Sequence, residues 1–110
     1  MSVSIIYGVF CSYREEEILE PIKEKACNYD KEIKTYHVDF ENSEDLDGTI
    51  IGIKINELDA LYTGAMDITK IESKVTDEIK NKINNMVIET KLFNYIKSFS
   101  KIWIYLDLDK

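Results

Sequence analysis

The 110-residue chain is poor in the residues that most catalytic and cofactor sites require: it has one histidine, four glycines and two cysteines. A single histidine excludes a histidine-based metal cluster within the chain, and four glycines are too few to write any of the glycine-rich nucleotide-binding motifs. Cys11 and Cys27 lack a metal-ligand spacing and are too few for a disulfide scaffold, so we expect both to pack as ordinary side chains. We therefore predict no catalytic residue, no metal and no cofactor, although an enzyme that uses scattered carboxylates or tyrosines remains an alternative.

Long apolar runs and positive charge are also scarce. No apolar run approaches the roughly 18 residues of a membrane helix, and residues 1–11 lack the basic region and cleavage site of a signal peptide. With 21 acidic against 14 basic residues the net charge is −7, and Arg14 is the one arginine. Nucleic acids and anionic membranes attract Lys and Arg, so we expect neither as a partner. We expect a single domain over residues 1–110 that resides in the cytoplasm with reduced thiols.

Alternating apolar residues predict four strands, over residues 3–11, 32–40, 49–55 and 102–108. A helix is predicted from within two residues of Ile18 to about Tyr29, with Pro21 in its first turn, where a missing N–H costs little. Residues 56–100 are predicted to hold two or three helices, a short one ending near Gly64 and a longer one from Ile71 to beyond Val87.

The element order β-α-β-β-α(α)-β favours an α+β fold of the ferredoxin-like, split βαβ kind. This arrangement is a four-stranded antiparallel sheet with spatial order 4-1-3-2 and helices on one face. Within it we take the first and third strands to run parallel. The surplus helical material after the third strand leaves a different α+β topology open.

On this arrangement the loops that follow the first and second strands lie at opposite ends of the sheet, and the last strand ends beside the second loop. Six acidic residues would then gather at one end: Glu41, Glu44, Asp45, Asp47, Asp107 and Asp109. A solvated turn with a frayed terminus is one interpretation, and an electrostatic docking surface for a basic protein is another. A calcium site is a third, although residues 44–48 lack the alternating ligands of a calcium loop.

The sheet face turned away from the helices is the second candidate site. Period-two alternation places Tyr36, Val38, Phe40, Ile102, Ile104, Leu106 and Leu108 toward the core. It leaves an apolar and aromatic band on the outer face, with Phe10, His37, Ile50, Trp103 and Tyr105 as candidate partner-binding or dimer residues and Ile6 and Thr35 beside them. Such a band marks an interface. A protein partner, a second copy or one of the surplus helices would cover it.

In size, acidity and lack of catalytic chemistry the chain resembles the small immunity proteins and inhibitors by which bacteria and phages block toxins or effectors, although no motif carries this likeness. The leading hypothesis is a non-catalytic binding protein that docks and blocks a basic protein partner. The alternative is a homodimeric ferredoxin-like domain that pairs through its sheet face and has a small-molecule-binding or enzymatic role.

Overall fold

The computed structural model describes residues 2–12, 16–38, 48–59 and 67–107. The elements in chain order are β1 (Ser2–Ser12), α1 (Glu16–Tyr29), β2 (Ile33–Val38), β3 (Gly48–Asp59), α2 (Ile68–Ser73), α3 (Asp77–Glu89), the 3₁₀ helix η3 (Leu92–Tyr95) and β4 (Ile96–Asp107). Of the helix predicted to end near Gly64, residues 58 and 59 belong to β3, and residues 60–66 lie outside the described part of the chain.

The strands form one four-stranded sheet in the order β2-β3-β1-β4, and every neighbouring pair is antiparallel. The predicted α+β class with a four-stranded antiparallel sheet is confirmed. The parallel pairing of the first and third strands was wrong, because Ser2 lies opposite Asp59 and Ser12 lies opposite Gly48. The crossover from β3 to β4 holds α2, α3 and η3 rather than one helix, so the ferredoxin-like assignment itself stays a prediction.

Side-chain caps fix where the helices of this crossover begin. The Asp67 carboxylate accepts from the Thr69 N–H at 3.0 Å at the start of α2, and the Thr76 hydroxyl accepts from the Ile79 N–H at 3.3 Å at the start of α3. Such caps satisfy N–H groups that the first turn leaves unpaired. The residues predicted as one long helix are therefore two. In α1, Pro21 lies in the second turn rather than the first.

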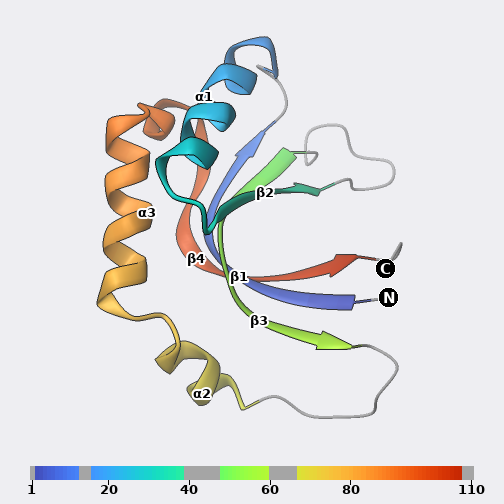
Figure 1. The fold of residues 1–110 in the computed structure, drawn as a ribbon. Helices are drawn as coiled ribbons and strands as arrows, with labels where there is room; N and C mark the ends of the chain where they lie inside the picture. The colour runs from blue at the N-terminus through green and yellow to red at the C-terminus, as the bar shows by residue number, and fades with distance from the viewer. Residues whose placement is uncertain (1, 13–15, 39–47, 60–66, 108–110) are drawn as a thin grey trace.

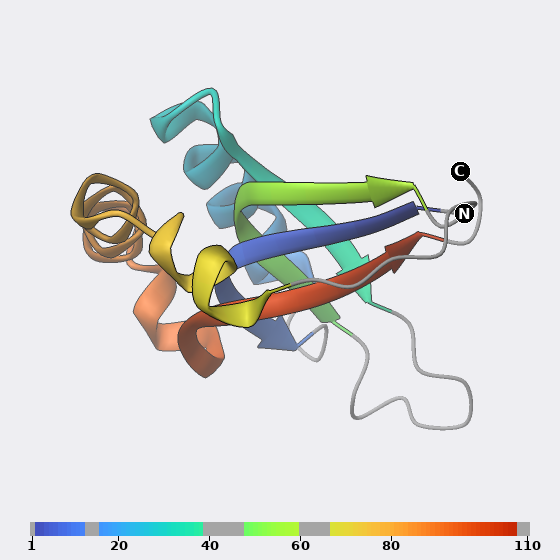
Figure 2. The ribbon, with the colours of Figure 1, turned by 90° about the horizontal axis from the view of Figure 1, so that it is seen from below.

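The helices α1 and α3 pack on one face of the sheet (Figure 1). The core cluster between them draws on the middle of the sheet, on both helices and on η3, and comprises Val9, Cys11, Ala26, Ile33, Ile51, Ile53, Ile83, Met86 and Leu92. Its strand residues all come from one half of each long strand. The other half of the sheet, which includes residues 2–6 of β1, contributes no residue to this cluster. In that half β3, β1 and β4 run side by side (Figure 2).

The sheet is strongly curved, with α1 and α3 on its convex side (Figure 1). The register between β1 and β3 shifts at Ile5/Ile6, and the register between β1 and β4 shifts after Gly8. Bulges of this kind bend a strand and increase its twist. Gly8 and Gly52 face each other at the bend, and a Cβ on either would collide with the backbone of the opposite strand. Glycine at both positions therefore allows the close approach of β1 and β3.

Candidate functional site: a hollow on the concave sheet face

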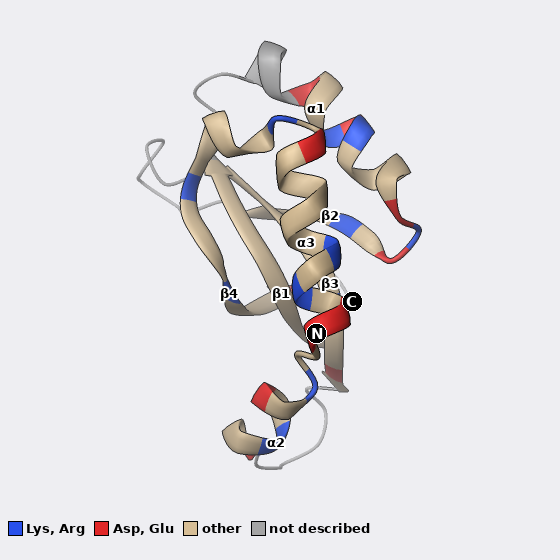
Figure 3. Ribbon diagram, turned by 90° about the vertical axis from the view of Figure 1, so that its left-hand side faces the viewer, with Lys and Arg blue, Asp and Glu red and all other residues tan. Residues whose placement is uncertain are grey.

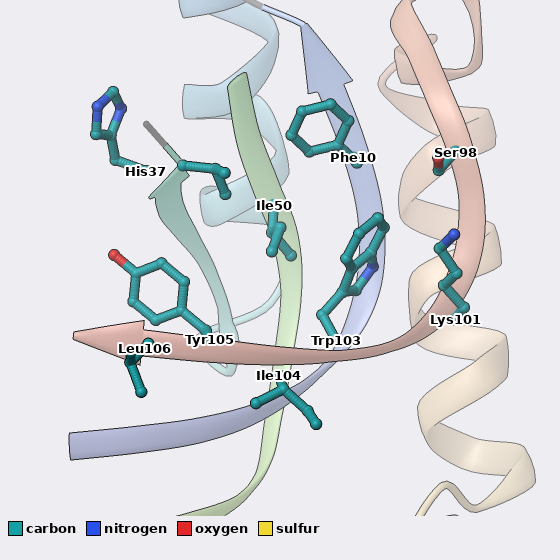
Figure 4. A pocket seen from close by; sticks show the side chains of 10 residues that line it. Phe10, His37, Ile50, Ser98, Lys101, Trp103, Ile104, Tyr105 and Leu106 are labelled. Carbon is teal, nitrogen blue, oxygen red and sulfur yellow. The ribbon is translucent and has the colours of Figure 1, made fainter. Parts of the chain in front are cut away.

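The concave face of the sheet encloses a hollow of about 520 Å³ (Figure 4). It is lined by Phe10 from β1, Ile50 from β3, His37 and Val38 from β2, and Ser98, Lys101, Trp103, Ile104, Tyr105 and Leu106 from β4. The five residues predicted to share the outer sheet face all line it. No described helix contributes to the lining, so none of the helical elements after β3 fills this space in the part of the chain that the structure describes.

Tyr105, which lines the hollow, contacts a second tyrosine from the opposite edge of the sheet. Tyr36 lies on β2 and Tyr105 on β4, yet their ring centroids are 5.3 Å apart with an interplanar angle of 60°. This edge-to-face geometry is favoured by aromatic quadrupoles. Burial raises the pKa of Tyr36, and the charge of Glu57 and the neighbouring Tyr105 add to the rise. The Tyr36 phenol therefore stays neutral at physiological pH.

A second aromatic pair forms the wall toward the bend. Phe10 and Trp103 have ring centroids 5.8 Å apart, tilted by 41°. The Trp103 indole N–H donates to the Gly8 carbonyl at 3.0 Å, beside the register shift between β1 and β4. The Lys101 ammonium lies 4.6 Å from the centroid of the Trp103 ring, a cation–π contact. Trp103 is therefore held in one orientation, with a positive charge next to its ring.

Two residues of the concave face are more buried than the sequence suggested, and one of them, Ile50, lines the hollow. Ile6 and Ile50 were expected in an exposed band, but they are 0% and 3% exposed. The curvature of the sheet folds the aromatic residues over them. Phe10, Trp103 and Tyr105 are half-buried, so each still presents part of its ring to the hollow. The arrangement offers apolar and aromatic contact, with Lys101, Ser98 and His37 as polar groups.

The predicted facing of β2 was wrong. Tyr36 pairs with Ile50 and Val38 pairs with Gly48, so both lie on the concave side rather than toward the helices. Thr35 lies instead with residues of α1, among them Pro21 and Cys27, at a separate shallow pocket. Both faces of the sheet carry apolar residues, so alternation alone could not tell which face the helices cover. His37 is exposed at the end of β2, on the rim of the hollow. Phe40 lies outside the described residues.

The predicted core positions near the end of β4 were also wrong. Ile104 is 72% and Leu106 is 52% exposed. From β4, only Ile96 packs against the core cluster, so α1 and α3 do not cover the half of the sheet that holds Ile104 and Leu106. Leu108 lies outside the described residues.

The strand direction on which the predicted acidic end rested was wrong. Asp107 lies opposite Ser2, at the start of β1, whereas Gly48, to which residues 39–47 lead, lies opposite Ser12 at the end of β1. The antiparallel run of β1 and β3 is the reason. Asp107 therefore lies at the other end of β1 from Gly48. The remaining members of the set lie outside the described residues: Glu41, Glu44, Asp45, Asp47 and Asp109.

Both cysteines are free, and both pack against other residues. Burial raises the pKa of the Cys11 thiol to about 12, partly opposed by the positive charge of Lys23. Burial also raises the pKa of Cys27. A thiol attacks as its thiolate, so neither environment activates sulfur as a nucleophile.

Among the described residues no three His, Cys, Asp or Glu side chains gather as metal ligands. The helices described are too short or too polar to cross a bilayer. Comparisons of the chain with protein-family models, curated proteins and solved structures gave no match. The hollow is thus the feature of the described structure from which a function can be argued.

Proposed function

We propose that the chain is a non-catalytic binding protein, of the inhibitor or immunity-protein kind, whose hollow receives hydrophobic side chains of a protein partner. The observation that carries this proposal is the contact of Phe10 with Trp103 in the hollow, together with the contact of Tyr36 with the lining residue Tyr105, on a concave face to whose lining no described helix contributes. Partly exposed aromatic residues in a concavity are typical binding hot spots, because a partner side chain that enters completes their burial.

The net charge of −7 supports a basic partner, since long-range attraction raises the rate of encounter. The hollow itself carries Lys101, so the inserted segment would place an acceptor group near that ammonium. Charge on the chain as a whole would then set the association rate, and apolar contact in the hollow would set the lifetime of the complex.

Two finer assignments belong with this proposal. The strand order read from β4 is 4-1-3-2, which supports the ferredoxin-like class, with α2 and η3 as additions to its second crossover. The free thiols of Cys11 and Cys27 support a reducing compartment, and we place the chain in the cytoplasm.

The test begins with affinity capture from the native host, using three baits. Wild type is compared with Phe10→Ala, which removes one wall of the hollow from the central strand β1. Phe93→Ala is the matched control, because Phe93 is 54% exposed on η3 and does not line the hollow. Circular dichroism and urea unfolding verify that each bait is folded.

The proposal expects one protein to be retained by wild type and Phe93→Ala and lost with Phe10→Ala. That protein, once purified, should bind wild type with a rate constant for association that falls as salt rises. If every captured protein is retained equally by all three folded baits, the hollow is not the binding surface and the proposal is wrong.

A small apolar molecule is the second candidate occupant, and the size of the hollow favours it. Its 520 Å³ falls within the range of about 300–1,000 Å³ of small-molecule sites, which are mostly apolar with a few polar groups. Native mass spectrometry of protein purified from its host separates the two candidates. A bound small molecule that is lost in Phe10→Ala and kept in Phe93→Ala would replace the protein partner in this account.

A further inference from the structure

The strand β4 is an edge of the sheet, bonded to β1 on one side only. No described element runs alongside its outer edge (Figure 3). Ile104 and Leu106 on this strand are among the most exposed large apolar residues in the described chain. A long edge strand with exposed apolar residues is a template for pairing with another strand.

The part of β4 suited to such pairing is the regular run of residues 101–107. Its register with β1 proceeds without a shift from Lys101 opposite Gly8 to Asp107 opposite Ser2. The N-terminal part of β4 is interrupted by two register shifts, which bend the strand. A straight partner strand could therefore follow residues 101–107 over their whole length.

This run is self-complementary when it is read antiparallel about Ile104. By the alternation of the strand, Lys101, Trp103, Tyr105 and Asp107 belong to the concave face, and Ile102, Ile104 and Leu106 belong to the other. Ile104 and Leu106 also reach the hollow, because β4 is the edge strand. Pairing two copies about Ile104 places Lys101 opposite Asp107 of the second copy and Trp103 opposite its Tyr105. On the other face Ile102 lies opposite Leu106 of the second copy, and the two Ile104 residues meet.

Neighbouring registers lack this match. A pairing centred between two residues would set hollow-side residues against residues of the other face, which the pleat forbids. A centre on Trp103 would place Lys101 opposite Tyr105, and a centre on Tyr105 would place Trp103 opposite Asp107. The centre on Ile104 joins both opposite charges, both aromatic residues and the aliphatic residues, all of which are favourable cross-strand pairs.

We propose that the chain forms a two-fold symmetric homodimer through antiparallel pairing of β4, over residues 101–107 and centred on Ile104. The two sheets then continue into one, with both hollows on the same face. This interface is the edge of the sheet rather than its face. The paired run shares residues with the lining of the hollow, but the pairing is tested on the purified chain without any occupant of the hollow. Equal retention of every captured protein by all three baits, which would overturn the proposed function, would therefore leave the dimer unaffected.

Sedimentation of wild type and two lysine variants tests the surface. We expect a dimer at about 100 µM that dissociates on dilution, since the interface is small. Ile104→Lys should sediment as a monomer, because two like charges would face each other across the symmetry axis. Phe99→Lys adds the same charge at a position 84% exposed on the same strand but outside the paired run, and it should stay dimeric. A wild-type monomer at this concentration, or an Ile104→Lys dimer, overturns the proposal.

A charge swap tests the register. In a dimer of Lys101→Asp, position 101 of each copy would place an aspartate opposite Asp107 of the other copy. In a dimer of Asp107→Lys, two lysines would face each other at the same two places. Each variant alone should therefore be monomeric. Mixed, the two variants should form a heterodimer, because both cross-strand pairs are then Asp with Lys. Native mass spectrometry distinguishes the mixed dimer by mass. If the mixture stays monomeric while wild type dimerises, the register centred on Ile104 is wrong.

Discussion

Tyr36 and Tyr105 lie on the two opposite edge strands of the sheet, and their ring centroids are 5.3 Å apart. Edge strands of a flat four-stranded sheet would be separated by two intervening strands, each about 4.8 Å from its neighbour. The contact is therefore direct evidence of how far the sheet curls. The concave face is therefore a hollow rather than an open platform, and its aromatic residues lie where a partner can bury them.

The tyrosine contact should be measurable as a coupling between the two edges. A double-mutant cycle with Tyr36→Leu and Tyr105→Leu should give a coupling of about 0.5–1.5 kcal/mol in the free energy of unfolding, the usual size for an edge-to-face pair. Urea unfolding of the four proteins measures it. The same cycle with Tyr36→Leu and Phe93→Leu should give none, and a zero coupling for the tyrosines would show that the edges do not meet.

The bend should depend on Gly8 and Gly52. Gly8→Ala and Gly52→Ala should each lower the free energy of unfolding by about 1–3 kcal/mol, because the added Cβ collides with the opposite backbone. Asn84→Ala, on the exposed side of α3, is the control and should have little effect. Unchanged urea midpoints for both glycine variants would mean that β1 and β3 do not approach so closely.

The indole hydrogen bond of Trp103 should stabilise the wall of the hollow. Trp103→Phe keeps an aromatic ring and removes the donor to the Gly8 carbonyl. We expect a loss of about 0.5–1.5 kcal/mol in the free energy of unfolding from the hydrogen bond, with a further loss from the smaller ring. Thermal and urea unfolding provide the measurement, and equal stability of the two proteins would contradict this role.

The two thiols should differ in reactivity, and Cys11 should make stability depend on alkaline pH. With iodoacetamide near pH 8, Cys27 should be alkylated before Cys11, as peptide mass spectrometry can show.

Burial raises the pKa of Cys11 from 9.0 to about 12, so the folded state holds its proton more tightly than the unfolded state. This contribution is complete below pH 9 and is lost as the pH rises from 9 toward 12. Cys11→Ala should flatten that part of the stability curve, and an unchanged curve would contradict the assignment.

Alternation was enough to predict the four strands and to gather Phe10, Ile50, Trp103 and Tyr105 on one face, because period two is a local property of the backbone. Alternation could not tell on which face of the sheet Tyr36 and Val38 lie, since both faces carry apolar residues and the helices could have packed on either. Ile104 was misplaced for a related reason: its pattern is that of a core strand, but the helices end before they reach it.

The curvature that creates the hollow depends on contacts that no local pattern reports. Gly8 and Gly52 are far apart in sequence and become informative only when their strands are paired. The same holds for Tyr36 and Tyr105, whose contact follows from the curl of the whole sheet. The prediction that Asp107 lies at the same end as the start of β3 was wrong at a single step, the direction of β3 relative to β1.

The most direct measurement uses the single tryptophan of the chain, which lies in the hollow. Protein labelled with 5-fluorotryptophan gives one ¹⁹F resonance, from position 103, which is followed while the unlabelled protein partner from the capture experiment is added. The account predicts a new resonance that saturates at the stoichiometry of the complex, with Phe93→Ala behaving like wild type and Phe10→Ala binding at least about tenfold more weakly. A partner that binds by calorimetry while the resonance stays unchanged and Phe10→Ala keeps full affinity would contradict it.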